Sequence, residues 1–250
     1  MNEFLEKWDR KNLLDAIKEF SELYESRPIK DNNGGMKSAH MFPAWFIVQQ
    51  MKPKYLIESG VWKGLGTWFF EKASPKTKII SIDPEPRFRV YTSPNSTHQT
   101  EDFLKTDWSH LSKDDTLIFF DDHQDCLPRI KKCLQLGFKN IIVEDNYPYQ
   151  QGDCYTPKKI LSKLNYCIDK GGCKEIYPHK EEDYNFLEKN IENYQEMPPF
   201  FKPDLTRWGD SWDENYPTPD SLLKETSKHD YPVFWEERFD YTWICYIKLK

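Results

Sequence analysis

The chain has 250 residues, of which 30% are charged and 38% hydrophobic, and its formal net charge at pH 7 is −6. No apolar run approaches the ~20 residues that a membrane span needs. The net negative charge also lacks the excess of basic residues that is typical of nucleic-acid-binding proteins. We therefore expect neither a membrane nor a nucleic-acid partner. The start of the chain lacks the apolar region of a signal peptide, and the six cysteines have no CxxC spacing, so we expect a cytoplasmic protein with reduced thiols.

Two helices are predicted at the start of the chain. Apolar residues recur at helical intervals up to the Arg27-Pro28 pair, which ends the first helix, and a second helix is expected over Phe42 to Met51. The first pattern consists of Phe4, Leu5, Trp8, Leu13, Leu14, Ile17 and Phe20. We interpret residues 1–50 as an N-terminal helical cap.

From residue 52 onward, short apolar strands alternate with helices, which predicts an α/β fold with a doubly wound, mostly parallel sheet. Gly137 is expected to end its helix as the C′ residue. The predicted strands cover 55–57, 78–82, 116–120 and 140–143, and the predicted helices start at 67 and cover 127–136 and 157–168. Residues 52–172 form the expected ligand-binding core.

The segment 178–240 has no hydrophobic period and is rich in proline, acidic residues and tryptophan. A long irregular stretch of this kind is typical of an insert or lid. The last strand is predicted within 241–250 and is expected to pair with 232–236 as an antiparallel hairpin. We expect these parts to form one domain over residues 1–250.

A glycine-rich turn follows the first predicted strand. Only ten glycines are present, and three of them, Gly60, Gly64 and Gly66, lie between Glu58 and Thr67 in the pattern E-x-G-x-x-x-G-x-G-T. The pattern is neither the dinucleotide fingerprint nor a P-loop. It is consistent with a ligand-binding turn at the carboxyl edge of the sheet or with a plain connection between strand and helix.

This segment resembles the first motif of the class I S-adenosylmethionine-dependent methyltransferases. The resemblance implies a Rossmann-like seven-stranded fold and a cofactor held by Glu58, Gly60, Gly64 and Thr67. It also implies that Asp83, at the end of the second strand, binds the ribose hydroxyls, for which a carboxylate is well suited. Asp102 is the expected partner of the adenine amino group, and Asp107 is its rival.

A second group of polar residues follows the next two strands. Asp121 and Asp122 end one strand, and Asp145 and Asn146 end its neighbour. Carboxylate and amide oxygens suit Mg²⁺ or Mn²⁺, and several acids brought together without a cation would repel one another. We predict a divalent-metal site, with ordinary strand-terminating turns as the alternative.

The pairs Asp122-His123 and Asp145-Asn146 resemble the metal-binding motifs of the divalent-metal-dependent O-methyltransferases of the catechol type, and the macrocin-type sugar enzymes have a related acidic set. The catechol-type enzymes place a lysine base three residues after the metal-binding aspartate, where this chain has Asp125. The base therefore does not carry over from the family, and His123 and His40 are the candidates in its place.

Taken together, the motifs predict a methyltransferase acting on a hydroxyl of a small molecule or a sugar, assisted by a divalent metal. Trp208, Trp212 and Trp235 are candidate stacking platforms for the acceptor. Two alternatives stay open: a cephalosporin-hydroxylase-like enzyme of different chemistry, and an inactive methyltransferase-like binding protein. The sequence leaves the oligomeric state undetermined, and a homodimer is compatible with it.

Overall fold

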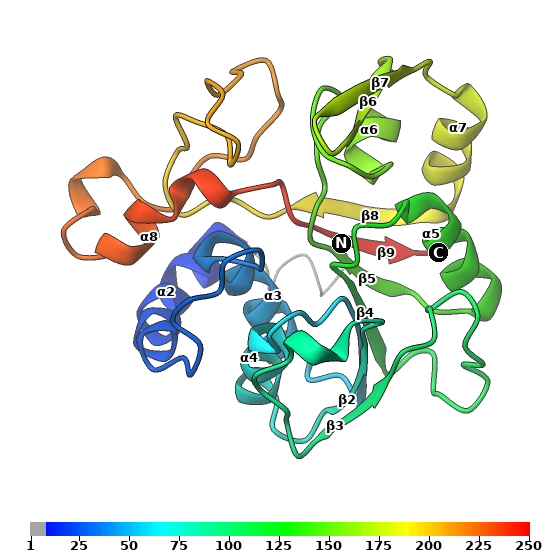
Figure 1. Cartoon of the computed structure of the whole chain (residues 1–250), viewed down its shortest axis with the longest axis horizontal. Helices are drawn as coiled ribbons and strands as arrows, with labels where there is room; N and C mark the ends of the chain where they lie inside the picture. Colours follow the sequence, from blue (N-terminus) through cyan, green and yellow to red (C-terminus); the bar gives the residue numbers. More distant parts are fainter. Residues whose placement is uncertain (1–8) are drawn as a thin grey trace.

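A computed structural model describes residues 9–250 of the chain (Figure 1). Its main sheet has seven strands in the order β3-β2-β1-β4-β5-β9-β8. The strands are β1 Tyr55–Ser59, β2 Lys78–Ile82, β3 Ser96–Gln99, β4 Thr116–Phe120, β5 Asn140–Val143, β8 Ile191–Glu196 and β9 Cys245–Leu249. The first five pair in parallel, and β9 runs antiparallel to both β5 and β8. The predicted seven-stranded Rossmann-like fold is confirmed.

The parallel strands β1, β2, β4 and β5 form because each is a short apolar run that both layers of helices bury, whereas β3 is polar and lies at the edge of the sheet. β4 is buried along its whole length. The helices are α2 Arg10–Glu25, α3 Ser38–Met51, α4 Leu65–Ala73, α5 Cys126–Leu136, α6 Pro157–Leu161, α7 Glu181–Asn190 and α8 Pro232–Glu236, with 3₁₀ turns at Pro86–Phe88, Glu225–Ser227 and Arg238–Asp240. Gly137 ends α5 with a φ of +86°, as its position predicted.

The two faces of the sheet are covered by different parts of the chain. Helices α2, α3 and α4 pack on one face together with aromatic residues of the C-terminal segment, and α5, α6 and α7 pack on the other (Figure 1). Phe200 stacks on Phe234 with ring centroids 4.1 Å apart, and both rings contact Phe20 of α2. The N-terminal helices and the C-terminal segment therefore share one core.

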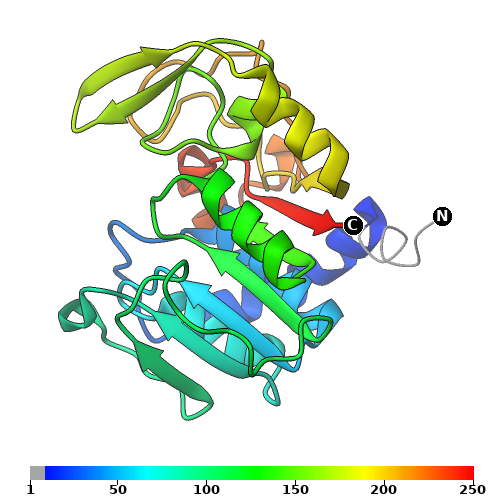
Figure 2. The same ribbon diagram turned by 90° about the vertical axis from the view of Figure 1, so that its right-hand side faces the viewer.

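The structure corrects the predicted helix over 157–168. The helix ends at Leu161, and Tyr166–Lys170 is a strand, β6, that pairs with β7 (Cys173–Tyr177). Gly171 and Gly172 connect the two strands with φ values of +67° and +90°, which is the conformation of a two-residue hairpin turn. This hairpin extends beyond the main sheet (Figure 2).

The predicted partner of the last strand is also corrected. Residues 232–236 form helix α8, which has Pro232 in its first turn, and the antiparallel partners of β9 are β5 and β8. β8 lies inside the 178–240 segment, so that segment contributes a strand to the main sheet as well as irregular structure. The predicted first helix begins at Arg10 in the structure, and its apolar residues Phe4, Leu5 and Trp8 lie outside the described residues.

Candidate functional site

The glycine turn joins β1 to α4 and packs closely against its own chain. Gly60 has a φ of +94°, and a Cβ atom there would lie 1.9 Å from the carbonyl oxygen of Asp121. Gly64 has a φ of +88°, and its Cβ would lie 2.4 Å from the carbonyl oxygen of Tyr91. Both positions therefore require glycine, because φ is positive and a side chain would collide with neighbouring backbone. Packing within the chain is sufficient to explain these two glycines.

Glu58 lies on the inner side of the turn, buried under it. Its carboxylate accepts hydrogen bonds from Thr67 Oγ1 at 2.5 Å and from Ser81 Oγ at 2.9 Å. Burial raises the pKa of Glu58 to about 7, although the two hydroxyl donors favour the charged form. Glu58 and Thr67 thus hold α4 against β1 and β2 and support the turn from behind.

Asp83 fixes the turn from the end of β2. Its Oδ2 accepts the backbone N–H of Trp62 at 2.9 Å, and its Oδ1 accepts the N–H of Glu85 at 2.8 Å. A carboxylate offers about four acceptor positions, so each oxygen can still accept a hydroxyl. The carboxyl edge of β1 and β2 therefore has a preorganised acceptor for a diol.

Next to this turn, a buried guanidinium joins two acids. Arg129 of α5 donates from Nε to Asp122 Oδ2 at 2.9 Å and from Nη2 to Asp102 Oδ2 at 2.8 Å. Ser59 Oγ also donates to Asp122, at 2.6 Å. These residues line a cavity of about 100 Å³ that also touches Gly60 and the end of β2. Since pockets that enclose a whole small ligand measure ~300–1,000 Å³, this cavity would enclose only part of one.

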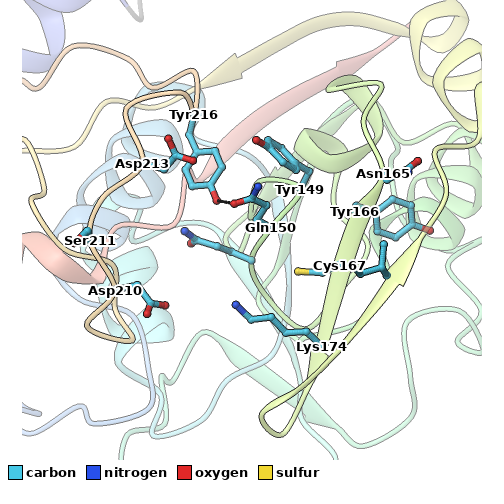
Figure 3. Close-up of a pocket in the computed structure, with 12 residues that line it drawn as sticks. Tyr149, Gln150, Asn165, Tyr166, Cys167, Lys174, Asp210, Ser211, Asp213 and Tyr216 are labelled. Carbon is cyan, nitrogen blue, oxygen red and sulfur yellow. Dashed lines mark hydrogen bonds between the residues drawn. The ribbon is translucent and has the colours of Figure 1, made fainter.

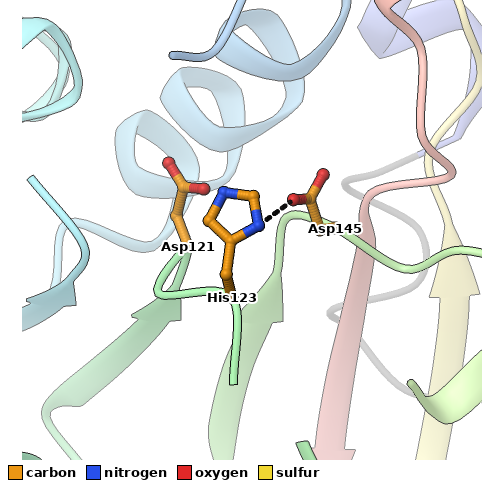
Figure 4. Close-up of side chains that lie close together, drawn as sticks. All are labelled: Asp121, His123 and Asp145. Carbon is orange, nitrogen blue, oxygen red and sulfur yellow. Dashed lines mark ion pairs between the residues drawn. The ribbon is translucent and has the colours of Figure 1, made fainter. Parts of the chain in front are cut away.

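Asp121, His123 and Asp145 come together at the ends of β4 and β5 (Figure 4). One potential ligand atom from each lies within 4.8 Å of the others. Asp145 is buried, and within the described part of the chain its Oδ2 has no hydrogen-bond partner. His123 Nδ1 lies 3.3 Å from that oxygen. A buried carboxylate oxygen that accepts no hydrogen bond is costly, so this atom is suited to a cation, whether the protonated His123 or a metal ion.

The electrostatics of this group are set by burial and by a third acid. Burial raises the pKa of the Asp121 and Asp145 carboxyls above their ordinary value, and the negative charge of Glu144 raises both further. His123 Nδ1 forms a hydrogen bond with Asp153 Oδ2 at 3.0 Å, which is the main reason that the pKa of His123 rises to about 9. Without a metal, a protonated His123 therefore offsets part of the acidic charge.

A segment from the C-terminal region reaches the same group. The 205–211 loop is closed by a β-bridge between Leu205 and Ser211. From this loop, Arg207 Nη1 lies 3.4 Å from Asp145 Oδ1 and donates to Tyr147 Oη at 3.0 Å. Trp208 is 53% exposed and lies against the ring of Tyr147, with centroids 5.3 Å apart.

Of the three predicted tryptophan platforms, the exposed ring of Trp208 lies beside the acidic group. Trp212 is stacked on Trp243 with ring centroids 4.7 Å apart, and Trp235 packs against Phe201 and Arg238. The rings of Trp212 and Trp235 are therefore already packed against other side chains.

Two residues expected at the metal site lie apart from Asp121, His123 and Asp145. Asp122 points to Arg129 and Ser59, because consecutive side chains at the end of β4 point in different directions. Asn146 is fully buried, where Nδ2 donates to Tyr194 and Oδ1 accepts the N–H of Lys158. Asn146 thus anchors α6.

The candidates for the base are placed as follows. His40 is buried in α3, accepts the N–H of Thr242 at Nε2 and contacts Glu144 through Nδ1, and burial lowers the pKa of His40 to about 4. Asp125 accepts the backbone N–H of Tyr155 and lies at the start of α5. Because the structure brings Asp121 into the acidic group, the position three residues further on is Gln124, which is not a base either.

The donor set fits a divalent cation. Two carboxylates and one imidazole suit Mn²⁺ well, and the carboxylates with added water would suit Mg²⁺. Glu144 is buried next to the two aspartates and would add a third carboxylate. Asp121, Asp145 and His123 are the residues that would hold the ion.

Sequence reasoning missed Arg129 and Arg207. Arg129 occurs in a helix whose apolar pattern gives no sign of a buried charge, and Arg207 belongs to a segment without a period. The pairing of Asp153 with His123 could not be predicted either, since the two residues are 30 positions apart and no motif links them. In the sequence, only the position of Glu144 directly before Asp145 indicated that a third acid would lie at this site.

In the described part of the chain, the helices are all too short or too polar to cross a bilayer. No family model matches the sequence, and no curated protein is similar to it.

Solved structures similar to this chain include methyltransferases. The SAH-bound methyltransferase PaMTH1 of Podospora anserina has 18% identity, covering 52% of this chain and 62% of that one, with a TM-score of 0.39. The O-methyltransferase TomG of Streptomyces achromogenes, in complex with SAM, has 13% identity over 57% and 65% of the two chains and a TM-score of 0.36. A structure described as cmcI-D160 Mg-SAM has 19% identity over 42% and 52%, also with a TM-score of 0.36. The matches span between about half and two thirds of the length of those proteins.

Proposed function

We propose that this chain is an S-adenosylmethionine-dependent O-methyltransferase that acts on a hydroxyl of a small molecule or a sugar with the help of a divalent metal. The observation that carries the proposal is the juxtaposition of two groups at one edge of the sheet. Asp83 stands at the glycine turn with acceptor capacity for a ribose diol, and Asp145, whose Oδ2 accepts no hydrogen bond and lies against His123, belongs to a cluster fit for a cation three strands away. Ligands of open α/β sheets bind at this carboxyl edge.

The cofactor would lie over the glycine turn, with Asp83 accepting its ribose hydroxyls and with part of it in the cavity beside Asp102 and Asp122. The transferred methyl group leaves the sulfonium sulfur as a C–O bond forms at the acceptor, and the hydroxyl proton must pass to a base. Most of the rate gain would come from holding the two reactants in line.

Asp121, Asp145 and His123 would hold the metal, which when bound lowers the pKa of a coordinated hydroxyl. The fixed pairing of His123 with Asp153 orients the imidazole. Arg207 lies on the other side of Asp145 and would face the bound acceptor from the loop that carries it.

Calorimetric titration with S-adenosylhomocysteine, with and without MnCl₂ and EDTA, tests this proposal. We expect binding that Asp83→Ala weakens at least tenfold and that Asp114→Ala, a matched change of an acid that is 84% exposed, leaves within twofold. Transfer of labelled methyl to a panel of phenols and sugars should then require the metal. Absence of cofactor binding by the folded wild-type protein would refute the methyltransferase proposal, and full transfer in EDTA would refute the metal assignment.

One observation favours a second candidate, a methyltransferase-like protein that binds a ligand without transferring a methyl group. The glycines of the turn are accounted for by packing, and Arg129 already pairs with both Asp102 and Asp122 beside a cavity of about 100 Å³. If Arg129→Ala gains affinity for S-adenosylhomocysteine while the wild type does not bind it, this second candidate is the correct one.

A further inference from the structure

A cleft of about 810 Å³ lies between the β6–β7 hairpin and the segment 210–216, with residues 149–151 along its side (Figure 3). This volume is in the range of pockets that hold small organic ligands. The cleft is outside the cofactor edge and is not used by the function proposed above.

Polar side chains from all three segments line the cleft. Gln150 Oε1 accepts the hydroxyl of Tyr216 at 3.0 Å, which fixes the amide and leaves its NH₂ group for a ligand. Lys174 of β7 and Asp210 face the opening from opposite walls (Figure 3). Within residues 9–250, neither the Lys174 ammonium nor the Asp210 carboxylate has a hydrogen bond or an ion pair. Donors and acceptors are thus available on both sides.

Tyrosine rings give the walls a fixed shape. Tyr166 is held between Tyr155 and Tyr177, with centroid distances of 4.4 and 5.6 Å. Tyr149 and Tyr216 meet edge to face at 5.6 Å. Side chains already immobilised by packing lose little entropy when a ligand binds.

The cleft and the acidic group share two chain segments. The loop that carries Gln150 and Gln151 continues to Asp153, which bonds to His123. The 205–211 loop, which carries Asp210, also carries Arg207, which contacts Asp145. A ligand in the cleft therefore lies against the same two loops that border the proposed reaction centre.

We propose that this cleft binds an uncharged sugar unit of the acceptor, a proposal that rests on the methyl transfer proposed above. Sugar hydroxyls both donate and accept hydrogen bonds, which matches a lining of amides (Gln150, Gln151, Asn165), carboxylates (Asp210, Asp213) and one ammonium (Lys174). An apolar ring would bury these groups without partners. The charges in the lining sum to −1, which disfavours phosphorylated or sulfated ligands.

The test measures oligosaccharide binding without cofactor or metal, on an array that carries neutral gluco-, manno-, galacto- and xylo-oligosaccharides beside sialylated and sulfated ones. We expect neutral oligosaccharides to bind and Asp210→Ala to weaken that binding at least fivefold. Glu214→Ala, which removes an exposed acid four residues further along that pairs with Lys202, should leave binding within twofold. A Gln150→Ala/Gln151→Ala variant should lose binding with an unchanged thermal transition.

Binding of only the charged oligosaccharides, or of none, would overturn the sugar proposal, as would equal losses in Asp210→Ala and Glu214→Ala. The proposed methyl transfer and the proposed sugar site can be refuted independently of each other. Sugar binding by a protein that does not bind S-adenosylhomocysteine would refute the methyltransferase, whereas cofactor binding without sugar binding would refute the role of the cleft.

Discussion

Arg207 Nη1 lies 3.4 Å from Asp145 Oδ1, so a residue of the C-terminal segment contacts an acid at the end of β5, 62 positions earlier in the chain. The same nitrogen donates to Tyr147 Oη at 3.0 Å. The contact is largely buried, with 22% and 6% of the two side chains exposed. The acidic group is therefore linked to the loop that we expect to meet the acceptor.

Replacing Arg207 by alanine should loosen that loop. Both the ion pair and the hydrogen bond to Tyr147 are lost, while the bridge between Leu205 and Ser211 remains. We expect amide hydrogens of residues 204–212 to exchange at least threefold faster by mass spectrometry, with the thermal transition shifted by only a few degrees. Lys202→Ala removes a cation that is 66% exposed and should not change the exchange. Equal protection in Arg207→Ala and wild type would contradict the role of this contact.

Single substitutions should distinguish the roles of the two aspartates at the end of β4. Asp121→Asn should weaken Mn²⁺ binding at least tenfold in calorimetry or electron paramagnetic resonance, because it removes a proposed ligand charge. Asp122→Asn should leave Mn²⁺ affinity within about twofold and should instead lower stability, because it leaves Arg129 with less buried countercharge. If Asp122→Asn lost the metal and Asp121→Asn kept it, the cluster would be wrongly assigned.

Stability should depend on pH through Glu58. Its pKa is about 7 in the folded protein against 4.5 ordinarily, so between these values the folded state holds a proton that the unfolded state has released. The free energy of unfolding should therefore fall as the pH rises from 5 to 8, by at most ~3 kcal/mol. Glu58→Gln removes this contribution.

Urea unfolding at pH 5, 6.5 and 8 measures the effect as the difference between wild type and Glu58→Gln. That difference should decrease steadily with pH, and the exposed-site control Glu214→Gln should follow the wild-type profile. Parallel profiles for wild type and Glu58→Gln would show that Glu58 does not titrate in this range.

Replacing Gly60 and Gly172 by alanine should lower the stability of the protein by very different amounts. Gly60 and Gly172 have nearly equal φ values, +94° and +90°, but a Cβ at Gly60 would meet the Asp121 carbonyl oxygen at 1.9 Å, whereas no described atom lies within 4 Å of one at Gly172. Gly172→Ala should cost ~1–2 kcal/mol from backbone strain alone. Gly60→Ala should exceed ~4 kcal/mol or abolish folding. Similar unfolding midpoints for the two variants would contradict the close packing of the turn.

Four of the five parallel strands could be predicted from the sequence because each is a short apolar run, whereas β3 was missed because Ser96–Gln99 is polar. Strands 78–82, 116–120 and 140–143 occur where expected, and the order of the sheet follows once β1 and β4 are neighbours. β6 was read as helix because Tyr166 to Ile168 continues an apolar run, although Gly171-Gly172 marked the hairpin turn. β8 has a half-buried, mixed pattern that only its pairing with β9 explains.

The site was predictable in its location and less so in its members. The strand ends that carry Asp83, Asp121 and Asp145 were identified from sequence, because parallel strands end at one edge. Which of two adjacent aspartates faces the cluster depends on the direction of each side chain past the end of β4, and the sequence does not encode that locally. Arg129 and Arg207 depend on tertiary contacts across 7 to 62 positions.

The position of β9 has a consequence for how the chain folds. β9 lies between β5 and β8 and is synthesised after the other strands of this sheet, so β8 has no partner in the main sheet until residues 245–249 are available. During synthesis, the five parallel strands can assemble before β9 has been made. Until then, α7, β8 and the 197–244 segment cannot take their final positions. Such late, long-range pairing slows folding, and it leaves the edge of β5 open to other chains in the interval.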